Sequence, residues 1–176
     1  MEKQKLKYLG YSIVLEEVPD EISLAINISG CPHKCEGCHS KYLWKDDGEI
    51  LEDNLDKLLD KYEDYITCVC FMGGDQDLIQ LWHCCKKVKE RGLKVCIYTG
   101  YDTMLPFAHL SFFSNSYMDN GFVDYIKTGR YHKYFGGLNN KSTNQRMYRI
   151  LDKDNTIDGL RFKDITYRFQ RGLKDD

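Results

Sequence analysis

Three cysteines lie within eight residues in the stretch GCPHKCEGCHSKYLW, which runs from Gly30 to Trp44. Three residues separate Cys31 from Cys35, and two separate Cys35 from Cys38. Thiols gathered this closely form a disulfide, bind a zinc ion, hold an iron–sulfur cluster or serve no metal at all. No other feature of the chain restricts its fold and its chemistry as strongly.

The surrounding sequence favours a metal over a disulfide. The N-terminal segment is charged and lacks an apolar run long enough for a signal peptide, and no later segment approaches the ~20 apolar residues that span a bilayer. We therefore expect a cytoplasmic protein, in which clustered cysteines are more often metal ligands than disulfides. The net charge of -2 offers no attraction to nucleic acid or to an anionic membrane.

Apolar residues follow the strand period and the helix period in turn along the chain. This pattern predicts strands within residues 21–29, 65–74, 93–100 and 121–129, and helices within 51–65 and 77–92. Residues 165–169 are predicted as a last edge strand and 170–176 as a tail. Strands and helices that alternate through short connections predict one α/β domain over residues 1–176, with a mainly parallel sheet.

The remaining cysteines and the ends of the predicted strands divide the chain into core and site. Five cysteines lie in apolar segments and are expected to pack in the core: Cys68, Cys70, Cys84, Cys85 and Cys96. The strands end in GC, GGD, TGY and KTGR, at Gly30, Gly73, Thr99 and Lys127. Because the carboxyl ends of parallel strands open on one edge of a sheet, we expect these four ends to surround one site.

Two metal sites fit three thiolates. His33 or His39 can complete a closed Cys3His zinc site. Alternatively, an iron–sulfur cubane held by only three cysteines keeps one iron open to a substrate, as a catalytic metal requires. The position of the cysteines at a strand end, with GGD downstream, favours the open cubane.

The same residues resemble a known family. CxxxCxxC after the first strand is the signature of radical S-adenosylmethionine (SAM) enzymes. The stretch is similar, more narrowly, to the activating proteins of anaerobic ribonucleoside-triphosphate reductase, in which glycine precedes the third cysteine and tryptophan follows it, as Gly37 and Trp44 do here. GGD at 73–75, YTGY at 98–101 and STNQR at 142–146 extend the resemblance over roughly residues 8–150, which leaves 151–176 as a C-terminal extension.

The resemblance implies a partial (β/α) barrel of the radical SAM type. It also implies that Cys31, Cys35 and Cys38 hold a 4Fe-4S cluster, whose fourth iron binds the amino and carboxylate groups of SAM. One electron then breaks the C5′–S bond of SAM, and the 5′-deoxyadenosyl radical takes hydrogen from a glycine of the reductase. The implied partners are that reductase and a one-electron donor such as flavodoxin or ferredoxin.

The resemblance further implies a set of contacts to SAM. Asp75 is expected either to pair with the methionine amino group or to cap the following helix. Lys127 is expected to neutralise the methionine carboxylate. The full set of residues expected to bind the cofactor is Gly37, Cys38, His39, Gly73, Gly74, Asp75, Thr99, Gly100 and Lys127.

From Lys127 to Leu151 the chain has no acidic residue. This segment is either a solvated loop or a docking surface for the reductase, with Arg130, Lys133 and Arg146 as the expected contacts. Two other functions stay open. One is another small radical SAM enzyme, acting on a small molecule of the pterin or deazaguanine type, and the other is a zinc-binding module without catalysis.

Overall fold

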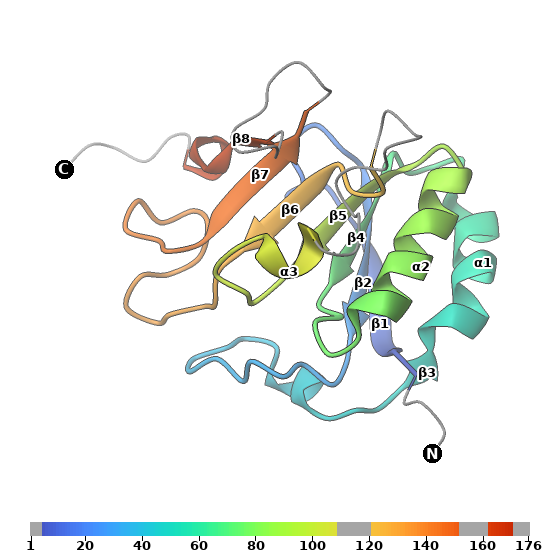
Figure 1. The fold of residues 1–176 in the computed structure, drawn as a ribbon, viewed down its shortest axis with the longest axis horizontal. Helices are drawn as coiled ribbons and strands as arrows, with labels where there is room; N and C mark the ends of the chain where they lie inside the picture. The colour runs from blue at the N-terminus through green and yellow to red at the C-terminus, as the bar shows by residue number, and fades with distance from the viewer. Residues whose placement is uncertain (1–4, 109–120, 152–161, 171–176) are drawn as a thin grey trace.

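The computed structural model describes residues 5–108, 121–151 and 162–170 (Figure 1). Within them lies one eight-stranded sheet in the order β3-β1-β2-β4-β5-β6-β7-β8. The strands are β1 (Lys7–Val14), β2 (Ser23–Ile28), β3 (Glu49–Ile50), β4 (Cys68–Met72), β5 (Lys94–Tyr98), β6 (Tyr125–Thr128), β7 (Arg146–Ile150) and β8 (Phe162–Asp164). The helices are α1 (Leu51–Tyr62), α2 (Leu78–Glu90) and α3 (Leu105–Ala108), with 3-10 turns at Lys41–Trp44 and Thr166–Phe169.

The sheet is parallel only at its centre. Strands β2, β4, β5 and β6 pair in parallel, whereas β1 and β3 on one side and β7 and β8 on the other pair antiparallel. The prediction of a mainly parallel sheet is therefore right for the four predicted strands and wrong for the sheet as a whole. The chain forms a mixed α/β fold, and β3 and β8 lie at the two ends of the strand order.

The two long helices form where the sequence predicts them. Helix α1 buries four leucines on one face and carries Glu52 and Asp53 in its first turn, where acidic side chains favour the helix dipole. Helix α2 begins at Asp77, whose side chain accepts a hydrogen bond from the backbone N–H of Gln80, 3.0 Å away. It ends before Gly92, which adopts a φ of 74° that glycine tolerates best.

Side chains from the sheet form two cores, one on each face. Val69, Phe71 and Ile97 pack with the buried residues of α1, α2 and α3 on the helical face. Cys68, Cys70 and Cys96 point to the other face, as period-2 alternation requires, and pack with residues from loops and from the C-terminal turn. In Figure 1, α1 and α2 lie side by side along the same side of the sheet.

The five cysteines predicted to lie in the core are all buried: Cys68, Cys70, Cys84, Cys85 and Cys96. Burial raises the pKa of the Cys84 thiol to about 12, which keeps it neutral at physiological pH. These cysteines therefore act as small apolar side chains, as their sequence context predicts.

Residues 165–169 are not the edge strand that the sequence predicts, because Thr166–Phe169 form a 3-10 turn. The backbone N–H of Thr166 donates to the Asp164 side chain, and the Thr166 hydroxyl accepts from the backbone N–H of Met147. These side-chain hydrogen bonds replace those of a continuing ladder and end β8. Residues 171–176, predicted as a tail, lie outside the described residues.

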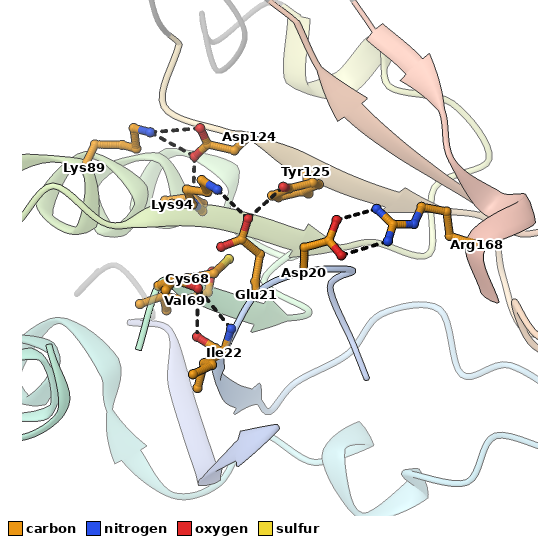
Figure 2. A network of polar contacts seen from close by, with 12 residues as sticks. Asp20, Glu21, Ile22, Cys68, Val69, Lys89, Lys94, Asp124, Tyr125 and Arg168 are labelled. Atoms are coloured by element: carbon orange, nitrogen blue, oxygen red, sulfur yellow. Dashed lines mark hydrogen bonds and ion pairs between the residues drawn. The ribbon is translucent and has the colours of Figure 1, made fainter. Parts of the chain in front are cut away.

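A network of polar contacts lies at the amino end of the sheet, and one ion pair beside it holds this C-terminal turn (Figure 2). Glu21, which is almost fully buried, accepts hydrogen bonds from Lys94 and from the hydroxyl of Tyr125, 2.5 Å and 2.8 Å away. Beside it, the Arg168 guanidinium forms a two-pronged ion pair with Asp20. The turn is thus fastened to the loop between β1 and β2, far along the sequence.

No helix in the described part of the chain is long and apolar enough to cross a membrane.

Candidate functional site

Residues 30–45, here called the cysteine loop, fold back on themselves after β2. The backbone N–H of Gly30 donates to the Lys45 carbonyl, and that of Cys31 donates to the Leu43 carbonyl, at 2.9 Å and 3.0 Å. The N–H of Cys38 donates to the carbonyl of Cys35 at 3.1 Å. These hydrogen bonds close the loop at both ends and bring its three cysteines near one another.

All three cysteines border one cavity of about 190 Å³, here called the cysteine cavity. It lies at the carboxyl ends of the parallel strands, so the loop and the strand ends share one space. The predicted site residues that border it are Cys31, Cys35, Cys38, Gly73, Asp75, Thr99, Gly100 and Lys127. Of the four strand ends expected to surround one site, Gly73, Thr99 and Lys127 border this cavity, whereas Gly30 does not, although the adjacent Cys31 does.

The cysteine thiols themselves are half-buried. Burial raises the pKa of the Cys31 thiol, while backbone N–H groups of His33 and Lys34 oppose that shift. The backbone N–H of Ser40 lies 3.4 Å from the sulfur of Cys38. Backbone donors of this kind favour the thiolate, which is the form that binds metals, over the thiol.

The arrangement of ligands differs from that of a closed site for one ion. In the described ranges, no three side chains of His, Cys, Asp or Glu converge closely enough to hold a single metal ion. A four-iron cluster spreads its thiolates over different irons. Three cysteines that border one shared space fit that second arrangement.

Asp75 is the most constrained polar side chain at the cysteine cavity. Its Oδ2 accepts hydrogen bonds from Nε2 of His33, at 2.7 Å, and from the backbone N–H of Gly100, at 2.9 Å. Its Oδ1 is buried and has no hydrogen-bond partner among the described residues. The predicted alternative, that Asp75 caps the next helix, is wrong, because Asp77 occupies the cap.

The glycines of the site are needed for different structural reasons. Gly73 and Gly74 have φ values of 112° and 103°, which L side chains rarely adopt. A Cβ on Gly74 would lie 3.1 Å from the Leu81 side chain, so this glycine serves packing and does not border the cavity. A Cβ on Gly100 would lie 2.3 Å from the ring of His33, so Gly100 leaves the room that the imidazole occupies.

Lys127 brings a buried amine to the cavity. Its Nζ donates to the Gly129 carbonyl at 2.8 Å and lies 5.9 Å from the centre of the Tyr98 ring. Burial lowers the pKa of Lys127 to about 8, although the nearby Cys35 and Asp75 act in the opposite direction. Thr99 is buried as well, and its hydroxyl accepts a hydrogen bond from the backbone N–H of Tyr101.

A larger cavity of about 750 Å³ lies over the loop-covered face of the sheet and is here called the sheet cavity. Glu17, Arg168 and Phe169 border its far end. It shares a wall with the cysteine cavity, formed by Cys38, Ser40, Met72, Tyr98, Lys127, Tyr131 and Gln145. A ligand in one cavity would therefore lie next to a ligand in the other.

Besides Gly74, two more predicted site residues lie away from the cysteine cavity. His39 is exposed, packs against Tyr131 and borders the sheet cavity instead. Gly37 has a φ of 78°, and a Cβ there would lie 3.0 Å from Cβ of Lys133. The observed neighbours of Gly37 are thus side chains from the loop after β6, whereas the resemblance implies a contact with the cofactor there.

The segment from Lys127 to Leu151, which has no acidic residue, is only partly a loop, because it contains β7. Lys133 forms an ion pair with Glu36 of the cysteine loop. Arg146 donates from its guanidinium to the carbonyls of Thr143 and Gln145, so it supports the turn before β7. Arg130 is exposed at the mouth of the cysteine cavity.

From the sequence, His33 is expected only as a fourth zinc ligand. The structure instead buries its side chain against Asp75, with 5% of the His33 side chain exposed. Its position between Cys31 and Cys35 was the available signal, since a side chain there must lie beside any ligand of the cysteines.

Comparison with known proteins gives one match. A protein-family model described as a 4Fe-4S single cluster domain matches residues 22–119, which is more than half of the chain. The matched segment contains the cysteine loop and the ends of β4 and β5, and Lys127 lies beyond it. No curated protein and no solved structure matches the chain.

Proposed function

The chain belongs to the 4Fe-4S single cluster domain family, and on that basis we propose that it is a radical SAM enzyme that activates an anaerobic ribonucleoside-triphosphate reductase. The observation that carries this proposal is the shared cavity. Three cysteines at CxxxCxxC spacing border the same space as Asp75, whose buried Oδ1 lacks a partner among the described residues. A cluster ligand set and a side chain with an unused acceptor thus border one site, within what would be a partial barrel of the radical SAM type.

Cys31, Cys35 and Cys38 would hold the 4Fe-4S cluster. When bound, the cluster supplies the electron that breaks the C5′–S bond of SAM, which yields methionine and the 5′-deoxyadenosyl group that takes a hydrogen atom from a glycine of the reductase. The backbone N–H groups of His33 and Lys34, which act against the rise in the Cys31 pKa that burial causes, support this use of the loop.

The remaining residues bind and orient SAM. Asp75 accepts a hydrogen bond from the methionine amino group through Oδ1. Lys127, with a pKa of about 8, is mostly protonated at neutral pH and offers a positive charge to the methionine carboxylate. Leu43 and Trp44 border the same cavity and exclude water from it.

The reductase would approach the open side of the cysteine cavity, where Arg130 and Lys133 are exposed. Replacing both with Glu should weaken binding of the reductase and make it less sensitive to salt, because screened charges steer association. Lys86→Glu on α2 is the matched control, since Lys86 is exposed on the helical side of the sheet. Unchanged binding of the double variant at low salt would remove this docking surface from the proposal.

The whole proposal is tested by an anaerobic assay. The protein is reconstituted with iron and sulfide, reduced with dithionite and given SAM, and 5′-deoxyadenosine is measured. The reductase is then added, and a glycyl radical is sought by electron paramagnetic resonance. We expect both products from wild type and from Cys84→Ala, and neither from Cys35→Ala. A protein with a full cluster that forms no 5′-deoxyadenosine would refute the proposal.

A second candidate is a radical SAM enzyme that acts on a small molecule. The sheet cavity favours it, because about 750 Å³ lies within the usual range of small-molecule sites. The two candidates separate in the same assay. Formation of 5′-deoxyadenosine with no glycyl radical in the reductase would favour the small-molecule enzyme.

A further inference from the structure

We propose that His33 is a positioning residue for SAM. It holds Asp75 through one carboxylate oxygen, so that the other oxygen receives the methionine amino group. This inference rests on the proposed function and adds a residue to it that neither the cysteine motif nor GGD supplies.

The contact between the two side chains is buried and short. Nε2 of His33 lies 2.7 Å from Oδ2 of Asp75, and the two side chains are 5% and 3% exposed. The backbone N–H of Gly100 donates to the same oxygen from the end of the neighbouring strand β5. With two donors on Oδ2, rotation of the carboxylate would break both hydrogen bonds, so the direction of Oδ1 is fixed as well.

The His33 ring is held in turn by its surroundings. It packs edge-on against Tyr101, with ring centres 5.1 Å apart, and lies over Gly100, where a side chain would collide with it. Because His33 belongs to the cysteine loop and Asp75 to the segment after β4, their contact ties the cluster ligands to the expected amino-group acceptor. The distance between cluster and acceptor is then set by this pair.

Oδ1 of Asp75 is the atom that this arrangement leaves for a ligand. A buried carboxylate oxygen without a donor is unfavourable, and native proteins rarely keep one without a use. Oδ1 has no such donor among the described residues, and Asp75 borders the cysteine cavity. The N–H groups of an amino group supply the missing donors, and an amino group is the part of SAM that the cluster site would bring there.

The test measures binding by calorimetry on the reconstituted protein, with SAM and with its analogue that lacks the amino group. We expect His33→Leu to bind SAM about tenfold more weakly than wild type, a loss of about 1.4 kcal/mol. The analogue, which binds wild type more weakly, should show no additional loss. His33→Gln, whose amide N–H reaches as far as Nε2, should restore SAM binding to within about threefold. His83→Leu on α2 is the matched control.

Iron content is measured for every variant. If His33→Leu loses its cluster, SAM binding is compared between His33→Gln and His33→Asn instead. The shorter amide of Asn cannot reach Asp75, so tight SAM binding by the Gln variant alone supports the role. Equal losses for SAM and the analogue, or no loss at all, would overturn it while leaving the proposed function intact. Wild type that holds its cluster and binds neither ligand would overturn both.

Discussion

Gly100→Ala is a sharp test of the contacts around the site, because it adds one methyl group at a known position. The new carbon would lie 2.3 Å from Cδ2 of His33, where ordinary contacts begin at 3.4 Å, so the ring must retreat by about 1 Å. The hydrogen bond to Asp75, now 2.7 Å long, would be lost or badly bent. Gly100 does not have a positive φ, so the backbone itself tolerates alanine.

The expected cost follows from those contacts. A hydrogen bond to a charged group contributes about 1.5–3 kcal/mol, and the edge-on ring pair with Tyr101 about 0.5–1.5 kcal/mol. Alanine also lowers the conformational entropy of the unfolded chain, which offsets about 0.4–1 kcal/mol of this loss of stability. The free energy of unfolding of the metal-free protein should therefore fall by about 1–4 kcal/mol.

The assay is urea unfolding of four proteins: wild type, Gly100→Ala, His33→Ala and the double variant. In the His33→Ala background the ring is gone, so Gly100→Ala should be neutral or slightly stabilising. A cost below about 1 kcal/mol in wild type, or the same cost in both backgrounds, would show that Gly100 is not kept small for His33.

Three further changes test the packing and charge of the fold. Glu21→Ala should lower the free energy of unfolding by about 1–3 kcal/mol, because the buried Tyr125 hydroxyl loses its acceptor (Figure 2), and Tyr125→Phe should recover part of that loss. Arg168→Ala should lower the free energy of unfolding only slightly, because its partner Asp20 is largely exposed and solvent screens the pair; a marked loss of stability in urea unfolding would contradict this. Lys127→Met should stabilise the metal-free protein at pH 7 by about 1–3 kcal/mol, since the charged amine is buried there. Because the folded pKa of Lys127, about 8, lies below its ordinary value of 10.5, the penalty is complete below pH 8 and disappears toward pH 10.5, and a gain independent of pH would refute this origin.

The centre of the fold follows from sequence periodicity, and its edges do not. Strands β4 and β5 are nearly continuous apolar runs, because helices or loops cover both of their faces, and β2 alternates Leu24, Ile26 and Ile28 with smaller or polar residues. Strand β1 is different, since Leu9, Tyr11 and Ile13 are exposed on it and its pattern gives no clear inside and outside. Strand β8 has only three residues, too few for a period to emerge. The antiparallel flanks were missed for these reasons.

The site could be predicted where residues follow directly from the end of a strand. The cysteines, Gly73, Asp75, Thr99 and Lys127 all border one cavity, because parallel strands bring their carboxyl ends together. The role of Gly100 depends on His33, and the surroundings of Gly37 depend on Lys133. These contacts join segments far apart in the sequence, and spacing within one segment carries no information about them.

The central claim is that three cysteines hold a four-iron cluster with one iron left for SAM. The most direct measurement is Mössbauer spectroscopy of protein reconstituted with ⁵⁷Fe, before and after SAM is added, together with iron content. We predict about four irons per chain, one of which changes its signal when SAM binds. Four irons whose Mössbauer signals all stay unchanged when SAM is added, or a Cys35→Ala variant with the full iron content, would contradict the account.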